Sequence, residues 1–127
     1  MSRRFFITGT DTDCGKTLVT QGLMHLCRHQ GMTTAGMKPV ASGGTTQADG
    51  TLGNGDALSI QSCCSSSTSY HLVNPYCFEP PVAPHLAADM SATSIDLPPI
   101  QAAYAELSQR NECLLVEGVG GWRVPLN

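Results

Sequence analysis

The sequence predicts an α/β fold, a parallel sheet with flanking helices, and three observations lead to this prediction. An apolar run at residues 4–8 predicts a buried first strand. A glycine-bracketed loop follows it, and a helical pattern then extends from Lys16 to about residue 30. A second strand pattern follows at residues 33–40, and a third apolar run at 112–117 leads into another glycine loop. Strands separated by a helix pair in parallel through a right-handed crossover. The first two strands and the helix between them are therefore expected to form a βαβ unit.

Length and charge narrow the class of protein. A chain of 127 residues has the size of one domain, so we expect residues 1–127 to form a single domain. Hydrophobic residues make up 41% of the sequence and charged residues 13%, which suits a globular core. The formal net charge of −3 argues against a nucleic-acid-binding surface, which needs clustered lysine and arginine. An anionic nucleotide can still bind, because backbone amides, a lysine and a metal can hold phosphates.

The N-terminus and the cysteines predict a cytoplasmic protein. Residues 1–4 precede an apolar run that is too short for a signal peptide, and no apolar stretch approaches the length of a membrane span. The six cysteines include no CxxC pair and no cluster typical of a zinc site. Reduced thiols are therefore expected in place of a disulfide framework.

The apolar spacing predicts three helices. Leu18, Val19, Leu23 and Leu26 recur at helical spacing, so we expect them to form the buried face of the first helix. A short helix is expected at 56–61, capped by Asn54 or Gly55, and a longer one at 98–110.

Two long stretches lack a regular pattern. Residues 41–55 are rich in glycine, serine, threonine and asparagine, which predicts a long functional or mobile loop. Residues 70–86 contain four prolines, which predict a rigid, irregular lid or surface segment.

The segment GTDTDCGKT at residues 9–17 carries the most specific chemical signal. It follows a predicted strand and opens a helix, which is the context of a phosphate-binding loop and predicts the sheet of the P-loop NTPases. Gly15 lets the backbone approach a phosphate, and the first amides of the helix supply donors and partial positive charge. Lys16 can reach the outer phosphates, and the Thr17 hydroxyl can hold Mg²⁺. Five residues, one more than in the common pattern, separate Gly9 from Gly15. A plain glycine turn beside a surface lysine is the alternative.

Three further side chains lie at positions where this fold places its ligands. Lys38 is at the carboxyl end of the second strand, which favours a functional lysine over a solvated one. Glu117 ends the third apolar run, where an acid can hold Mg²⁺ beside the hydroxyl of the first loop, and a solvated carboxylate is the alternative. Asp56 lies in the first turn of a short helix, where a helix-stabilising role and a site role are equally compatible with its position.

Four segments, taken together and in this order, closely resemble the dethiobiotin synthetase family. They are residues 9–17, KPVASG at 38–43, NPY at 74–76 with Pro84 and His85, and VEGVGGW at 116–122. The segments span nearly the whole chain, and the extended spacing of the phosphate loop is also a property of that family. The resemblance implies a parallel sheet flanked by helices.

The resemblance further implies an enzyme of biotin synthesis that uses 7,8-diaminopelargonic acid, CO₂, ATP and Mg²⁺. One amine takes up CO₂ to give a carbamate, which attacks the γ-phosphate of MgATP. The other amine then closes the ureido ring of dethiobiotin on the carbamic–phosphoric anhydride and releases phosphate. Positioning and charge neutralisation should supply most of the catalysis. A cytoplasmic homodimer without nucleic-acid or membrane partners is expected.

The resemblance also assigns roles to individual residues. Lys38 is expected to be catalytic, together with Lys16 on the phosphates. The expected nucleotide contacts are Asp13, Cys14, Gly15, Lys16, Thr17, Leu18, Asp56, Glu117, Gly118, Val119 and Gly120. The expected Mg²⁺ ligands are Thr17, Asp56 and Glu117, and the expected substrate contacts are Thr12, Lys38, Ser42 and Gly120.

Chains of that family continue well past the point that corresponds to residue 127, so we expect this chain to cover the N-terminal portion of a longer domain. Whether this portion is active alone stays open. Partitioning ATPases and cobyrinate amidases share the fold type, but the partitioning ATPases carry a second lysine early in the loop, where this chain has Asp11. A nucleotide-binding module without catalysis is a further alternative, because a phosphate loop alone indicates binding and not turnover.

Overall fold

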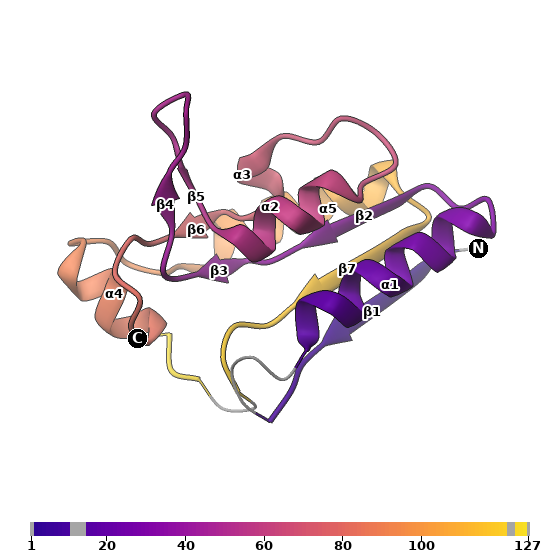
Figure 1. Cartoon of the computed structure of the whole chain (residues 1–127). Helices are drawn as coiled ribbons and strands as arrows, with labels where there is room; N and C mark the ends of the chain where they lie inside the picture. The colour runs from indigo at the N-terminus through magenta and orange to yellow at the C-terminus, as the bar shows by residue number, and fades with distance from the viewer. Residues whose placement is uncertain (1, 11–14, 122–123, 127) are drawn as a thin grey trace.

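A computed structural model describes residues 2–10, 15–121 and 124–126 of the chain. Its centre is a parallel sheet with the strand order β1–β7–β2 (Figure 1). β1 spans Arg3–Ile7, β2 spans Thr34–Met37 and β7 spans Cys113–Glu117. β7 lies between the first two strands and pairs in parallel with both, which confirms the predicted sheet.

The helices and the minor strands surround this sheet. The helices are α1 (Lys16–His29), α2 (Gly55–Ser62), α3 (Tyr70–Val73), α4 (Pro84–Met90) and α5 (Leu97–Arg110). β3 (Val40–Ala41) pairs in parallel with β6 (Tyr76–Cys77), and β4 (Thr45–Thr46) pairs antiparallel with β5 (Leu52–Gly53). The predicted loop at 41–55 therefore contains a hairpin, which projects from the body in Figure 1. The predicted irregular segment at 70–86 contains α3, β6 and the start of α4.

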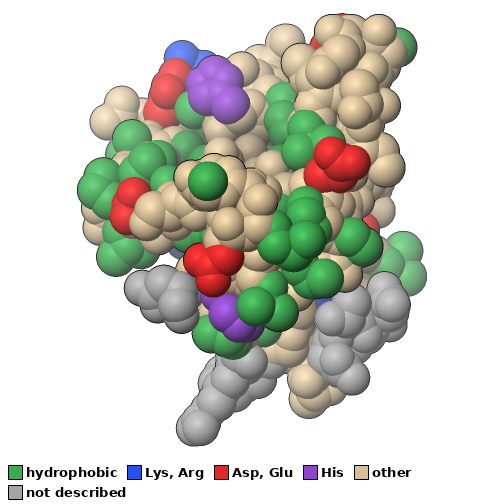
Figure 2. All heavy atoms as spheres, turned by 90° about the vertical axis from the view of Figure 1, so that its left-hand side faces the viewer, with side chains coloured by type: hydrophobic (Ala, Val, Ile, Leu, Met, Phe, Trp, Pro, Cys, Tyr) green, Lys and Arg blue, Asp and Glu red, His purple; other side chains and the backbone are tan. Residues whose placement is uncertain are grey.

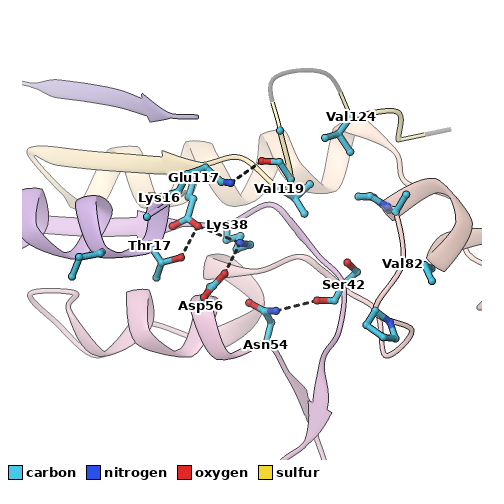
Figure 3. Close-up of a pocket in the computed structure, with 17 residues that line it drawn as sticks. Lys16, Thr17, Lys38, Ser42, Asn54, Asp56, Val82, Glu117, Val119 and Val124 are labelled. Atoms are coloured by element: carbon cyan, nitrogen blue, oxygen red, sulfur yellow. Dashed lines mark hydrogen bonds and ion pairs between the residues drawn. The ribbon is translucent and has the colours of Figure 1, made fainter. Parts of the chain in front are cut away.

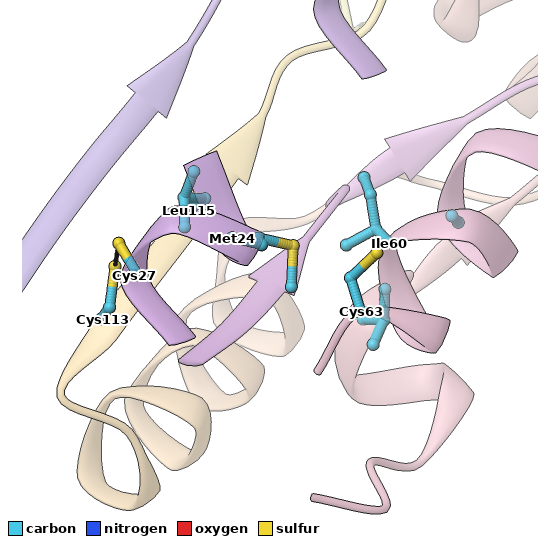
Figure 4. Packing of buried hydrophobic residues seen from close by; sticks show 8 residues of the cluster. Met24, Cys27, Ile60, Cys63, Cys113 and Leu115 are labelled. Atoms are coloured by element: carbon cyan, nitrogen blue, oxygen red, sulfur yellow. Dashed lines mark hydrogen bonds between the residues drawn. The ribbon is translucent and has the colours of Figure 1, made fainter. Parts of the chain in front are cut away.

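Helices cover both faces of the sheet. Cys113 and Leu115 of β7 pack against α1 and α2, as Figure 4 shows for Met24, Ile60 and their neighbours. Leu114, between them in sequence, packs on the opposite face with Leu107 of α5. β7 is therefore buried on both sides, as its continuous apolar sequence predicts. Every helix of the described residues is too short or too polar to span a lipid bilayer.

The predicted buried face of α1 is wrong for three of its four residues. Thr20, Met24 and Cys27 are buried, and Leu23 is partly buried against the same cluster, whereas Leu18, Val19 and Leu26 are exposed, with 76% of the Leu18 surface accessible. The buried residues continue the side of the helix on which Lys16 lies, because positions four apart on a helix face the same way. Lys16 is itself buried against the loop after β7, so the site sets the rotation of the helix and overrides the apolar pattern.

The first strand was expected to be buried, and this expectation is also wrong. β1 pairs with β7 on one side only and forms an edge of the sheet in the described part of the chain. Phe5 and Phe6 remain exposed, Phe6 to 67%. An edge strand lacks the neighbour that would cover its side chains. Further hydrophobic side chains are exposed on α4, and Figure 2, which views the left-hand side of Figure 1, shows hydrophobic and acidic side chains interspersed there.

Gly36 lets two helices cross β2 closely. A Cβ atom at this position would overlap with Ile60 Cγ2 of α2 and would lie 2.9 Å from Met24 Sδ of α1. We therefore expect Gly36→Ala to lower the free energy of unfolding by about 1–3 kcal/mol, the usual effect of overpacking a core. Urea denaturation would measure this change. Gly22→Ala on α1 is a matched control, because a methyl group there meets open space among the described residues and should stabilise the helix by about 0.5–1 kcal/mol. Equal free energies of unfolding for the two variants would contradict the packing argument.

Candidate active site

A cavity of about 730 Å³ lies at the carboxyl ends of β2 and β7 (Figure 3). Its wall is formed by the start of α1, the segment after β2, the start of α2, residues 81–84 and the loop after β7. Open α/β sheets bind their ligands at this end of the strands. Segments that are far apart in the sequence thus meet where the sequence places the site.

The start of α1 has the geometry of an anion-binding terminus. Gly15 precedes the helix with φ 92°, in the left-handed region that glycine adopts without strain. Gly15 stands at the N-cap position and offers no side chain to cap this end of the helix. A phosphate is the kind of group that completes such a terminus, since the helix dipole adds partial positive charge there.

Lys16 connects this terminus to the loop after β7. Its Nζ donates a hydrogen bond of 2.7 Å to the carbonyl oxygen of Gly120, and its side chain is buried. Gly120 has φ 65°, again in the left-handed region, which orients the loop for this contact. The start of α1 and the loop after β7 are therefore in direct contact at the cavity.

Glu117 is the centre of a polar cluster. Its side chain is only 1% exposed, and Oε1 accepts hydrogen bonds from Thr17 Oγ1 at 2.8 Å and from Lys38 Nζ at 3.2 Å. Lys38 Nζ also forms an ion pair with Asp56 Oδ2 at 3.0 Å (Figure 3). Four side chains, from the start of α1, the end of β2, the start of α2 and the end of β7, thus join in one chain of contacts.

The charges of this cluster leave room for a cation. Lys38 is one positive group between the two carboxylates of Asp56 and Glu117. Glu117 Oε2 is buried and has no hydrogen-bond partner among the described residues. A buried carboxylate oxygen without a partner is costly, and a metal ion removes that cost.

The donor atoms of the cluster fit Mg²⁺. Thr17 offers a hydroxyl, and Asp56 and Glu117 offer carboxylates, which are hard oxygen ligands. In the part of the chain that the structure describes, no three Asp, Glu, His or Cys side chains gather around one point. This fits Mg²⁺ as well, because the ion usually takes few protein ligands and completes its shell with water and phosphate oxygens. A cation there would adjoin both the helix terminus and Lys38.

Most of the predicted site residues line the cavity. They are Gly15, Lys16, Thr17, Leu18, Lys38, Ser42, Asp56, Glu117, Val119 and Gly120. Gly118 instead lines a neighbouring, mainly apolar cavity, and its amide donates to the carbonyl oxygen of Ile7. Thr12, Asp13 and Cys14 lie outside the described residues.

Sequence reasoning missed two parts of the wall. Asn54 caps α2 by accepting the Ala57 amide, as one of the two predicted caps, but its Nδ2 also donates to the carbonyl oxygen of Ser42 at 3.1 Å. Residues 81–84 line the cavity opposite Lys38, whereas their prolines indicated only a surface segment or lid. The prolines fix the local backbone, but no sequence pattern tells which side of the molecule it covers.

Comparison with known proteins identifies the family. A family model described as an AAA domain matches residues 3–127. The chain belongs to this family. The phosphate loop, α1 and the cluster around Glu117 therefore all lie within the matched AAA domain.

Three curated proteins that are similar to this chain share one name. A protein of Pseudomonas paraeruginosa is 50% identical over 96% of this chain and 54% of its own length. A protein of Chromohalobacter salexigens is 48% identical over 97% of this chain and 52% of its own length. A third, from Photobacterium profundum, is 42% identical over 100% of this chain and 57% of its own length. All three are named ATP-dependent dethiobiotin synthetase. The chain spans about half the length of these relatives.

Proposed function

We propose that this chain carries the phosphoryl-transfer site of an ATP-dependent dethiobiotin synthetase. The observation that supports this most is the position of Lys38, buried between Asp56 and Glu117 and one contact away from Thr17 of the phosphate loop. An NTPase that only hydrolyses ATP needs no second lysine there. The names of the curated relatives and the segments that resemble the family support the same function.

The reaction divides into steps that the residues of the cavity can assist. An amine nitrogen of 7,8-diaminopelargonic acid bonds to the carbon of CO₂ and loses a proton, which gives a carbamate. A carbamate oxygen attacks the γ-phosphorus of ATP, and ADP leaves. The second amine attacks the carbonyl carbon, closes the ureido ring and expels phosphate. The overall reaction uses one diamine, one CO₂ and one ATP.

Each group at the site has a place in this scheme. Lys16 and the first amides of α1 hold the phosphates of ATP. The Nζ atom of Lys38 neutralises the carbamate and its phosphorylated form, which both carry negative charge. Thr17, Asp56 and Glu117 would hold Mg²⁺, which neutralises phosphate oxygens during the transfer when it is bound. Ser42, Gly120 and Thr12 stay predicted contacts of the diamine, and Asp13 and Cys14 stay predicted contacts of the nucleotide.

Three other parts of the proposal have different supports. The choice of ATP rests on the family resemblance and on the names of the relatives, the homodimer on the resemblance alone, and the cytoplasmic location on the N-terminal sequence and the cysteines. A nucleotide-binding module without catalysis is the second candidate, because a phosphate loop alone indicates binding and not turnover.

One assay separates the two candidates. We expect the chain, supplied with ATP, Mg²⁺, bicarbonate and 7,8-diaminopelargonic acid, to form dethiobiotin and to release one phosphate per product molecule. Mass spectrometry would detect the product, and a phosphate assay would give the stoichiometry. Nucleotide binding by calorimetry without any product would favour the binding module. Phosphate release that does not depend on the diamine would indicate a plain ATPase.

A further inference from the structure

Three segments that carry site residues meet around Tyr70, which does not itself line the cavity. The Tyr70 hydroxyl accepts a hydrogen bond of 2.9 Å from the backbone amide of Asn54 and donates one of 2.7 Å to Asn74 Oδ1. Asn74 is 3% exposed, and its Nδ2 donates to the carbonyl oxygen of Lys38 at 2.7 Å and to that of Tyr76 at 2.9 Å. A continuous hydrogen-bonded bridge therefore runs from the start of α2 to the end of β2.

The donors and acceptors of this bridge match at every step. The Asn74 amide uses both N–H groups and its oxygen, and the Tyr70 hydroxyl is acceptor on one side and donor on the other. Burial raises the pKa of Tyr70 to about 12, so its hydroxyl keeps the donated proton across the neutral pH range. A fully satisfied polar network of this kind holds one geometry rigidly.

The two ends of the bridge lie next to the two partners of the Lys38–Asp56 ion pair. Asn74 holds the backbone of Lys38 itself, and Asn54 is the N-cap of α2, two residues before Asp56. The ion pair between Lys38 and Asp56 cannot fix this spacing alone, because the Asp56 side chain is 51% exposed and such partly solvated pairs are weak. Asn54 Nδ2 extends the same network to the carbonyl oxygen of Ser42.

We propose that Tyr70 is a positioning residue, whose hydroxyl fixes the spacing between the end of β2 and the start of α2 and so holds Lys38 opposite Asp56. The effect on turnover rests on the proposed function, whereas the effect on the position of Lys38 does not. Small displacements of a reacting group can cost about 100-fold in rate, so the loss of one hydroxyl outside the cavity can be visible in turnover.

Tyr70→Phe tests this proposal, with Tyr76→Phe as the matched control. Each variant removes one phenolic hydroxyl that accepts a hydrogen bond from a backbone amide. The Tyr76 hydroxyl accepts the amide of Asp96 at 3.2 Å, but only the Tyr70 hydroxyl belongs to the bridge. We expect Tyr70→Phe to lower kcat by about 10- to 100-fold while the KM for ATP changes less than about threefold, because the phosphate loop is untouched. Tyr76→Phe should leave both constants near the wild-type values.

A second measurement reports the environment of the Lys38 side chain and does not require enzymatic turnover. The chain has two lysines, Lys16 and Lys38, so ¹⁵N-labelled lysine gives two side-chain ammonium signals that Lys38→Met assigns. We expect Tyr70→Phe to shift or broaden the Lys38 signal and Tyr76→Phe to leave it in place. This readout stays informative if the wild-type chain forms no dethiobiotin, which would count against the proposed function and not against the bridge.

Two results would overturn the positioning role. One is a Lys38 signal at its wild-type position in folded Tyr70→Phe. The other is a Lys38 signal that shifts or broadens in Tyr76→Phe as much as in Tyr70→Phe. If Tyr70→Phe does not fold, Asn74→Asp replaces it, because that change keeps the acceptor for the Tyr70 hydroxyl and removes the donors to Lys38 and Tyr76. A wild-type Lys38 signal in that variant would equally overturn the proposal.

Discussion

Lys38→Ala is expected to reduce dethiobiotin formation by about 100- to 1,000-fold or more, the usual cost of removing a group that stabilises developing negative charge. The lysine is buried, it is held between two carboxylates, and its Nζ is the cationic group that Figure 3 shows between Glu117 and Asp56. Binding of Mg²⁺ and ATP should persist, because Lys16 and the start of α1 are unchanged. Steady-state kinetics and calorimetric nucleotide binding on the same preparation would separate the two effects.

Two further variants sharpen the test of Lys38. Lys38→Met keeps the aliphatic side chain and removes only the charge, so it should be as inactive as Lys38→Ala if charge is what matters. Arg110→Ala removes an exposed cation that pairs with Glu106 on α5 and does not line the cavity, so it should have wild-type kinetics. Wild-type turnover in Lys38→Met would refute the catalytic role. Loss of ATP binding in Lys38→Ala would show that the lysine serves the nucleotide site instead.

Glu117→Gln is expected to raise the Mg²⁺ concentration for half-maximal activity by at least about tenfold, because even indirect supports of a metal ligand have effects of about 10- to 100-fold. The amide oxygen can still accept hydrogen bonds from Thr17 and Lys38, so the fold should survive the change. The buried Oε2 becomes an NH₂ group, which also has no partner among the described residues, and Lys38 keeps Asp56 as its counter-ion. The free energy of unfolding without Mg²⁺ should therefore fall by only about 1–3 kcal/mol, the usual cost of an unsatisfied buried group.

Glu112→Gln is the control for this variant. Glu112 lies at the other end of β7, where hydrogen bonds from the Thr33 amide and hydroxyl lower the pKa of its carboxyl below 4.5. A lowered folded-state pKa adds stability above the unfolded value, and this stability is lost as the pH falls through the folded value. Glu112→Gln should thus lose that pH-dependent contribution and keep the wild-type Mg²⁺ requirement. Equal Mg²⁺ titrations for wild type and Glu117→Gln would refute the metal role.

The structure brings Lys38 and Glu117 together because both lie at positions that the topology defines. Lys38 follows β2 and Glu117 ends β7, and these strands pair in parallel, so the two side chains meet at the same end of the sheet whatever the packing elsewhere. The position of Asp56 in the sequence did not by itself assign a role, since the first turn of a helix is a suitable place for any carboxylate, and only the family resemblance made it an expected Mg²⁺ ligand. The structure brings its Oδ2 to 3.0 Å from Lys38 Nζ, which the sequence does not encode in any local pattern.

The wrong predictions, on the buried face of α1 and on the burial of β1, also have physical causes. The rotation of α1 follows from the burial of Lys16, a polar residue that the apolar pattern does not count. The exposure of Phe5 and Phe6 follows from the strand order, which places β1 at an edge of the described sheet. The bridge through Tyr70 depends on contacts between segments far apart in the chain, and a single sequence gives no sign of such contacts.

Gly36 links the packing of the core to the spacing of the side chains that we propose as Mg²⁺ ligands. The missing side chain lets α1 and α2 lie close over β2, and Thr17 and Asp56 are carried by the first turns of these two helices. A methyl group at position 36 would push the two helices apart. It would thereby separate the Thr17 hydroxyl from the Asp56 carboxylate without contacting either group. Mg²⁺ demands near-ideal octahedral distances, so its affinity is sensitive to such a spread. At the Mg²⁺ site that we propose, the preference for Mg²⁺ over the larger Ca²⁺ would thus depend on the absence of a side chain in the middle of β2.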